Sequence, residues 1–161
     1  LMALKKLTFV DNYSWKIGVK SCEKYPNLLS SDGSVTDIAV SLENAINFLR
    51  PRYVCASVDI LTEFLVEFGI KKVFSICETL FPVLRRSKST VVFTIETGAA
   101  PERDINVLKM LADSVIILRE KEVSDNIKLQ MLVEKFRGRA KIFRWLPYTF
   151  KNERIVIEAW Q

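Results

Sequence analysis

Residues 53–59 read Tyr-Val-Cys-Ala-Ser-Val-Asp, and they give the clearest indication of the fold class. The part before Asp59 carries no charge and is mostly apolar or small, which predicts a buried β-strand that ends on a carboxylate. Apolar residues at helical spacing lie on either side of it, over 35–49 and over 61–68. A strand between two amphipathic helices is typical of α/β proteins. We therefore expect an α/β fold with an acidic side chain at a strand end.

The residues before this stretch predict a strand, a loop and a helix. Leu7 to Val10 form a short apolar strand that ends in turn residues. Residues 12–33 are interpreted as a long loop. Apolar residues then recur at three- and four-residue steps, with Ser34 as the N-cap of the helix and Pro51 as its stop.

The residues after Asp59 predict two helices and a second strand. Gly69 supplies a left-handed cap for the helix over 61–68. Another helix follows from Val73, and Pro82 is expected to kink or divide it. Residues 90–95 are β-branched and aromatic almost throughout, which predicts a strand buried on both faces of a parallel sheet.

The last part of the chain changes from a helical to an alternating period. Pro101 can start a helix, and residues 114–118 predict the next buried strand. Beyond Asp125 the apolar residues alternate with polar ones as far as Glu158, which predicts antiparallel strands. We place no boundary between the two parts and interpret residues 1–161 as a single domain.

Composition limits the class of protein. The chain has 161 residues, of which 49% are hydrophobic, enough to bury one substantial core. No apolar run approaches the roughly 20 residues that span a bilayer, and the N-terminus lacks a secretory pattern, so we expect a cytoplasmic protein without a membrane partner. The net charge of +5 permits weak association with phosphates without requiring it.

Histidine is absent, which excludes catalytic sites that pair serine or cysteine with histidine. Any metal would have to be held by carboxylates. Cys22, Cys55 and Cys77 are odd in number and widely spaced, which favours reduced thiols over a disulfide framework or a zinc site.

Four segments carry a resemblance to a known family. They are residues 7–14 (Leu-Thr-Phe-Val-Asp-Asn-Tyr-Ser), 53–62 (Tyr-Val-Cys-Ala-Ser-Val-Asp-Ile-Leu-Thr), 112–118 (Ala-Asp-Ser-Val-Ile-Ile-Leu) and 133–138 (Val-Glu-Lys-Phe-Arg-Gly). In order and spacing they resemble the RecA-like ATPase core, and more narrowly its archaeal KaiC-like branch. The resemblance implies a RecA-like three-layer fold with a mostly parallel central sheet, incomplete at the N-terminus and followed by an antiparallel β-rich tail.

Asp59 matches the Walker B aspartate of this family, which orients Mg²⁺ or its water shell. The 161 residues contain no Gly-x-x-x-x-Gly-Lys-Ser/Thr loop, so we expect the N-terminal phosphate-loop unit (Walker A) to be absent. Asp59 alone would bind Mg²⁺ weakly, and no cofactor is certain: ATP with Mg²⁺ is expected only if the missing segment is supplied. The alternative is that Asp59 caps the following helix, whose positive end favours a carboxylate.

Two further groups follow from the resemblance. Thr94, Glu96 and Thr97 fall in the loop that senses the nucleotide in the family, although a plain turn into a helix fits equally. Lys135 and Arg137 match the family's Lys-x-Arg-Gly element, which reaches the neighbouring subunit's nucleotide in assembled rings. Two-residue spacing on a strand would project both cations from one face, and a solvated hairpin end is the alternative.

Three functions remain open. The first is a degenerate or truncated KaiC-like domain that does not hydrolyse ATP and acts in regulation, as a homo-oligomer or with a protein partner that covers exposed sheet surface. The second is the distal part of a longer, active KaiC-like ATPase. The third is a recombination-related module that binds nucleic acid. No catalytic residue is assigned, and we do not expect this chain alone to be an enzyme. The third function would use Lys135, Arg137, Arg139 and Lys141.

Overall fold

The protein is described by a computed structural model that covers residues 7–11, 14, 28–30, 35–49, 53–87, 89–123, 126–139 and 144–158. The chain forms two compact units, Leu1–Leu111 and Ala112–Gln161. The first holds all the described helices and the parallel strands, and the second is an antiparallel sheet. The architecture is therefore mixed α/β, with short parallel sheets and a separate antiparallel sheet. The interpretation of residues 1–161 as one domain stays a prediction.

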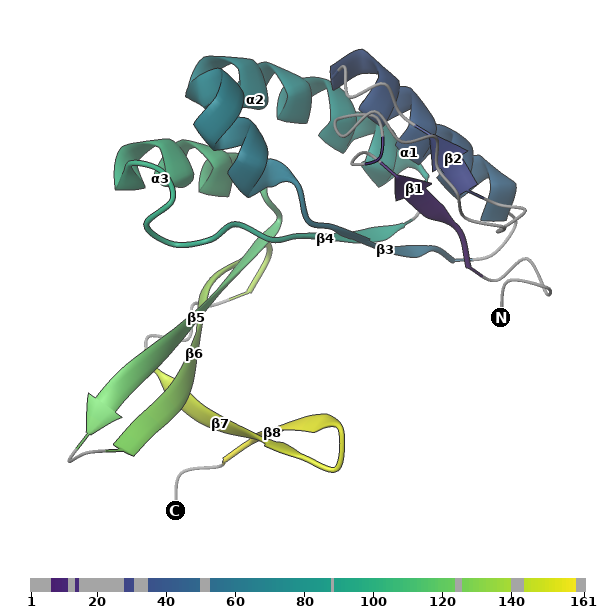
Figure 1. Ribbon diagram of the computed structural model, residues 1–161. Coiled ribbons are helices and arrows are strands. Elements are labelled where there is room, and N and C mark those ends of the chain that lie inside the picture. The colour runs from purple at the N-terminus through teal and green to yellow at the C-terminus, as the bar shows by residue number, and fades with distance from the viewer. Residues whose placement is uncertain are drawn as a thin grey trace. The chain divides into compact units, whose positions relative to one another are not determined.

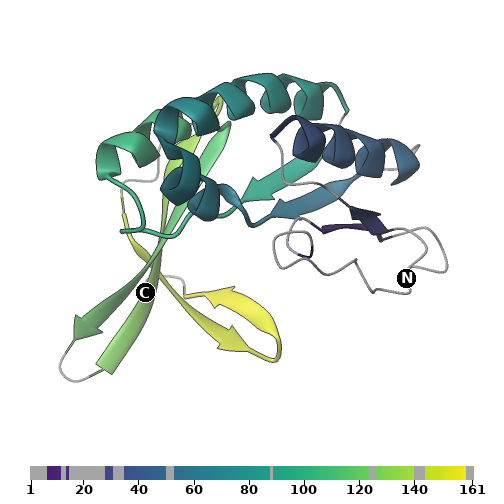
Figure 2. The same ribbon diagram turned by 45° about the horizontal axis from the view of Figure 1, so that its top comes forward.

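Helices cover one side of a short parallel sheet in the first unit (Figures 1 and 2). Strand β3 pairs with β4 in parallel, from Cys55 opposite Thr90 to Val58 opposite Phe93. The strand segments and helices that were predicted around Asp59 are thus confirmed. Their bounds are β3 (Cys55–Val58), β4 (Thr90–Phe93), α1 (Val35–Leu49), α2 (Leu61–Arg86) and α3 (Glu102–Leu111).

The core lies between these helices and one face of the sheet. Phe64, Val73 and Cys77 are the largest fully buried side chains, and Val91 and Phe93 of β4 pack against the same core. The opposite face is open, since Val92 keeps 55% of its surface exposed. The prediction that 90–95 is buried on both faces is therefore wrong, and the strand predicted over 53–59 is buried on one side only. Successive strand residues point to opposite faces, and the described helices lie on one side only.

The long helix α2 contains a break at Gly69, where φ is 70° and ψ is 168°. This positive φ confirms the predicted end of the first helical segment, because L-residues rarely adopt it. The expectation was that Pro82 kinks or divides the helix, and the division is wrong, because the helix continues to Arg86. Leu80 and Leu84, on either side of Pro82, are buried in the core, and this packing supports the helix across the proline.

A second parallel pair precedes α1. Strand β1 (Phe9–Asp11) lies one residue beyond the predicted Leu7–Val10 strand and pairs with β2 (Leu28–Ser30). β2 contradicts the interpretation of 12–33 as an uninterrupted loop. A three-residue strand is too short to show a hydrophobic period, so β2 could not be predicted from periodicity. The expected N-cap, Ser34, lies outside the described residues.

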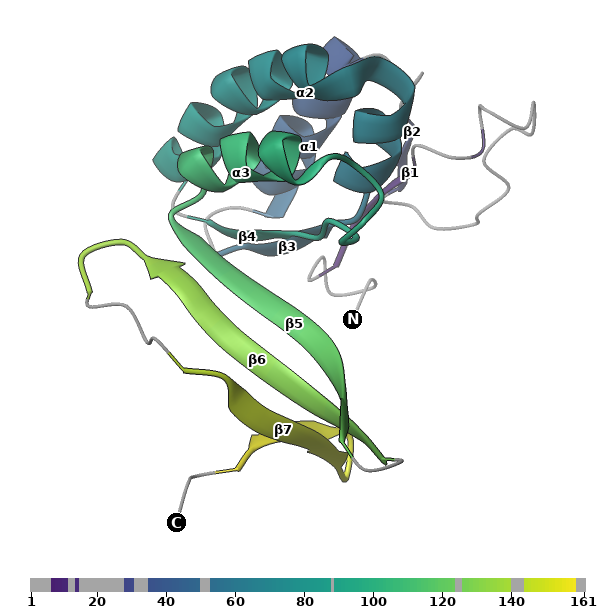
Figure 3. The same cartoon turned by 90° about the vertical axis from the view of Figure 1, so that its left-hand side faces the viewer.

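The second unit is an antiparallel sheet in the order β5-β6-β7-β8 (Figure 3). The antiparallel tail predicted beyond Asp125 is confirmed. The strand predicted over 114–118 exists as the start of β5. The prediction that it is buried is wrong, because Ile116 and Leu118 are 58% and 54% exposed. In the part of the chain that is described, no helix has the length and apolar character to span a membrane. The strands are β5 (Ser114–Val123), β6 (Asn126–Phe136), β7 (Leu146–Lys151) and β8 (Arg154–Ile157).

Candidate functional site

Asp59 lies at the carboxyl ends of the parallel strands β3 and β4. The last paired residues are Val58 and Phe93, and the Thr94 N–H extends this ladder by donating to the Val58 carbonyl at 3.2 Å. Asp59 and Thr94 are therefore neighbours one residue beyond the paired strands. The Thr94 hydroxyl donates a hydrogen bond to Oδ1 of Asp59. This is the edge where open α/β sheets usually bind ligands.

The first turn of α2 borders the same edge. The Ile60 carbonyl accepts the hydrogen bond of the Phe64 N–H at 3.1 Å, so the helix begins directly after Asp59. Oγ1 of Thr62 accepts a hydrogen bond from the Glu96 N–H at 2.9 Å. The loop that follows β4 is therefore tied to the start of α2, and Asp59, Thr62, Thr94 and Glu96 lie together.

The structure thus brings the predicted Thr94 and Glu96 to Asp59. Thr97 lies in the next turn, where Gly98 has a φ of 88°. Sequence reasoning missed Thr62, although a threonine in the first turn of a helix that follows a strand-end carboxylate was the available signal. Asp59 also stands next to the N-terminus of α2, where the helix dipole favours a negative charge, so the capping interpretation keeps its physical basis.

The donor set of this edge suits Mg²⁺ only together with phosphates. Asp59 supplies one carboxylate, and Thr62 and Thr94 supply hydroxyl groups. Within the described ranges, no group of three or more His, Cys, Asp and Glu side chains could hold a metal ion by itself. Mg²⁺ in nucleotide sites is commonly held by one or two carboxylates, with water and substrate phosphates as the other ligands. Asp59 fits that role and not the role of a self-sufficient metal site.

Lys135 and Arg137 belong to the second unit. Strand β6 ends at Phe136, so Lys135 lies on the strand and Arg137 in the turn that follows, where Gly138 has a φ of 78°. The expectation that both project from one strand face stays a prediction, because Arg137 lies one residue beyond the end of the strand. Arg137 donates to Asp113 twice, from its backbone N–H to the carbonyl at 2.8 Å and from Nη1 to the carboxylate at 2.9 Å.

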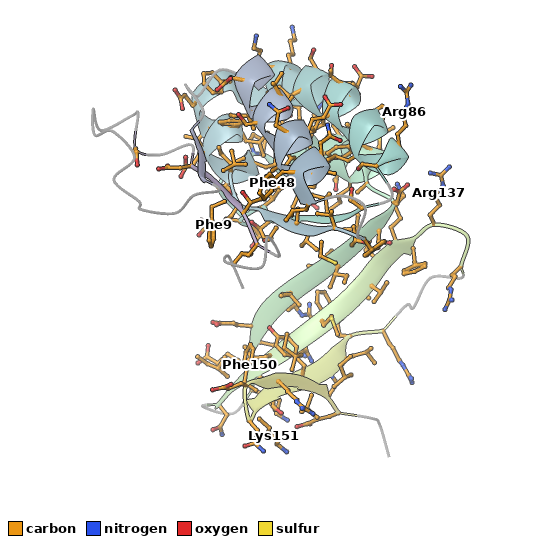
Figure 4. All side chains as sticks on the ribbon, turned by 90° about the vertical axis from the view of Figure 1, so that its right-hand side faces the viewer. Phe9, Phe48, Arg86, Arg137, Phe150 and Lys151 are labelled. Atoms are coloured by element: carbon orange, nitrogen blue, oxygen red, sulfur yellow. The ribbon has the colours of Figure 1, made fainter. Side chains whose placement is uncertain are left out.

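The Arg137 side chain, labelled in Figure 4, remains 74% exposed although it is paired with Asp113. An anion that approached it would compete with a carboxylate already in place. Lys141 lies outside the described residues. Asp59 belongs to the first unit and Lys135 to the second, so the two groups of residues are described as separate sites.

Comparison with known proteins gives a family match and two structural neighbours. A family model described as "ATPase: KaiC" matches residues 2–160. The search of curated proteins found no match. A crystal structure of an uncharacterized Pyrococcus horikoshii protein, in complex with an unknown peptide, has a TM-score of 0.71 and 17% identity and covers 98% of this chain.

The second neighbour is a KaiC-like protein from Pyrococcus horikoshii OT3, with a TM-score of 0.60, 16% identity and 83% of this chain covered. At these identities the likeness concerns the fold. The chain spans 67% of the length of the first neighbour and 62% of the second.

Proposed function

Because the chain belongs to the KaiC family of ATPases, we propose that it is a KaiC-like domain that acts in regulation, by association with its own kind or a partner, without hydrolysing ATP. The observation that carries this proposal is the edge formed by Asp59, Thr62, Thr94 and Glu96, in a sequence that has no Gly-x-x-x-x-Gly-Lys-Ser/Thr loop. The edge has the acidic group of a nucleotide site. The loop that would surround the phosphates is not in the 161 residues.

Charge explains why hydrolysis is not expected. In phosphate-loop ATPases, backbone N–H groups and a lysine neutralise the triphosphate while the acidic residue holds Mg²⁺. Asp59 carries the same charge sign as the phosphates and can favour them only through a metal ion. Mg²⁺ would supply charge neutralisation at this edge when it arrives with ATP. Alone, the edge should bind Mg-ATP weakly and leave the γ-phosphate unactivated.

The open face of β3 and β4 supports association. Tyr53 is 67% exposed and Val92 is 55% exposed, and Cys55 is exposed on the same side. Parallel sheets are normally covered on both faces. We infer that a second copy or a protein partner covers this face and completes the RecA-like three-layer arrangement. Light scattering over a concentration series tests this, and a strict monomer at high concentration in the absence of any partner would contradict self-association.

Calorimetric titration with Mg-ATP and an ATPase assay test the proposed site. We expect binding weaker than micromolar, no turnover, and a further loss of binding in Asp59→Asn. Glu102→Gln is the matched control, because it removes another exposed carboxylate from the first turn of a helix in the same unit. Micromolar binding with turnover that Asp59→Asn abolishes would refute the non-hydrolysing role.

A second candidate function is that these residues form the distal part of a longer, active ATPase. It is favoured by the family and by the 67% and 62% of the two neighbours that the chain spans. Intact mass spectrometry of the protein from its natural source separates the two candidates. A mass near 18.5 kDa would exclude the longer enzyme, and a mass larger by a phosphate-loop unit would support it.

A further inference from the structure

Two lysines face each other in the second unit. Lys121 of β5 and Lys128 of β6 are direct cross-strand partners, and both are exposed. Like charges in directly opposed positions destabilise a sheet. Repulsion between the two ammonium groups therefore lowers the stability of the sheet, and a bound anionic ligand would reduce that repulsion.

Arg119 lies next to this pair in a fixed orientation. Its Nε and Nη2 atoms donate to Oε1 of Gln130, its cross-strand partner, at 3.0 and 2.8 Å. Its guanidinium carbon lies 3.6 Å from the centroid of the Trp145 ring. The planar cation is thus held against an aromatic face, while the residue as a whole remains exposed.

The same face continues onto β7 and β8. Gln130 pairs with Pro147, so the strand alternation carries this face to Thr149 and Lys151. Lys151 in turn pairs with Arg154, a second cross-strand pair of like charges. The contact from Arg119 to Trp145, which directly precedes β7, agrees with this continuity. We call the side with Arg119, Lys121, Lys128, Lys151 and Arg154 the basic face.

The opposite face of these strands has different chemistry. Phe150 and Lys151 follow one another on β7 and lie on either side of its ribbon (Figure 4). The paired positions on the Phe150 side carry only Glu120 and Glu122 as charged residues, and the paired positions of the basic face in the described strands carry no carboxylate. A carboxylate does border the basic face, because Glu158, the residue after β8, donates its N–H to the Pro147 carbonyl at 2.9 Å. The exposed apolar residues of the Phe150 side are Ile116, Leu118, Ile127, Phe150, Ile155 and Ile157. Most of the exposed apolar residues of these strands therefore lie opposite the basic groups, whereas Val156, which pairs with Thr149 and is 38% exposed, lies on the basic face.

We propose that the basic face binds single-stranded nucleic acid. Cations two residues apart on a strand are about 6.7 Å apart, which spreads positive charge along the strand for a phosphate backbone. Bases stack on aromatic rings and on arginine planes, and Arg119 over Trp145 offers such a plane. An anionic membrane would be bound better by cations with several apolar groups among them, and here the exposed apolar residues other than Val156 lie on the opposite face.

This inference is independent of the proposed nucleotide edge, which lies in the other unit. It also differs from the sequence-based hypothesis centred on Lys135 and Arg137. Those residues lie at the end of β6 where Phe136 terminates the strand, whereas Lys128 lies near its beginning.

Fluorescence anisotropy with labelled oligodeoxythymidine tests whether the lysine charges contribute to binding. The full chain should bind at about 50 mM salt, and Lys121→Gln/Lys128→Gln should lower the slope of log K against log salt by about 1.4, since each charge contributes about 0.7 on single strands. Lys71→Gln/Lys72→Gln is the matched control: it removes two exposed lysines from α2 and the same net charge. No binding by the wild-type chain, or an equal loss in the control, overturns the proposal.

Two further variants test the stacking plane. Arg119→Lys keeps the charge and removes the planar group, and Trp145→Leu removes its support, so each should weaken binding about tenfold, a typical loss for one stacked base. Thermal melting followed by circular dichroism confirms that each variant is folded. Unchanged binding in a folded Arg119→Lys variant overturns the proposal. Equal affinity for duplex DNA, or for phosphatidylserine vesicles, overturns it too.

Discussion

The Thr94 hydroxyl donates a hydrogen bond to the Asp59 carboxylate across the ends of β4 and β3. The two residues are 35 positions apart in the sequence, and the hydrogen bond fixes the orientation of the Asp59 carboxylate at the sheet edge. The Asp59 carboxylate is therefore already oriented by a protein contact before any ligand arrives.

The first prediction concerns this bond. Thr94→Val keeps the shape of the side chain and removes the donor, so the free energy of unfolding should fall by about 1 kcal/mol. In an Asp59→Ala background the same change should cost less, because the acceptor is already gone. Urea unfolding of the four proteins in this cycle measures the coupling, and strictly additive losses would show that the bond contributes nothing.

The second prediction concerns the break in α2. Gly69 combines a φ of 70° with a ψ of 168°, and a Cβ placed there would meet no heavy atom within 4 Å. Any cost of Gly69→Ala must therefore come from the backbone, and we expect about 1–3 kcal/mol of destabilisation.

Ser75→Ala on the same helix provides the comparison for Gly69→Ala, since an exposed residue in regular helix should change stability by less than about 0.5 kcal/mol. Chemical denaturation measures both variants. Equal stabilities for the two would mean that the chain relaxes at position 69 without strain.

The third prediction concerns the two described cysteines. Cys77 is fully buried, whereas Cys55 is exposed. Because the thiolate is the reactive form and needs access to the reagent, a maleimide should label Cys55 in the folded protein and Cys77 only after unfolding. Peptide mapping by mass spectrometry locates the label. Rapid modification of Cys77 under native conditions would contradict the burial.

The fourth prediction concerns alkaline pH. Desolvation by burial raises the pKa of the Cys77 thiol to about 11, from an ordinary value of 9.0. Above about pH 9.0 the unfolded chain releases this proton while the folded chain keeps it, so the contribution to stability is complete below that pH and declines as pH rises towards 11. Urea midpoints across this range should fall more steeply for the wild type than for Cys77→Ala. If the urea midpoints of the two proteins fall equally with pH, Cys77 does not contribute to the loss of stability at alkaline pH.

The fifth prediction separates stability from binding at the basic face. Lys128→Glu turns the opposed Lys121–Lys128 pair into an attractive one, so the sheet should gain about 0.2–1 kcal/mol in unfolding free energy. The same change should weaken binding of oligodeoxythymidine. Thermal melts and anisotropy on one preparation measure both effects. A variant that is less stable would show that the lysine pair carries no strain.

Elements with a long hydrophobic period were predictable from the sequence. The helix over 35–49 shows several turns of one apolar face, and Gly69 marks the end of the next helical segment, and both are confirmed. β2 was missed because three residues carry no period. Burial on both faces was overestimated for 90–95, since an apolar run does not tell which of its sides is covered.

The candidate site was predictable in part. Asp59, Thr94 and Glu96 were each singled out because they lie at or just beyond the ends of predicted strands, and the structure shows that they lie at one sheet edge. Thr62 was missed because its contact is to a backbone N–H that lies 34 residues away. The Arg137–Asp113 ion pair depends on the end of β6 at Phe136, which the alternating sequence pattern did not indicate.

The placement of basic and apolar residues on different sides of the β5–β8 sheet also favours the correct register between its strands. A slip of one residue between neighbouring strands would exchange the two sides along a whole strand. Lysines would then lie beside Ile116 and Leu118, and apolar residues beside the cations, so a slip of one residue would be penalised at several positions at once. The amino-acid pattern that prepares this sheet for a ligand thereby also discourages misfolded pairings.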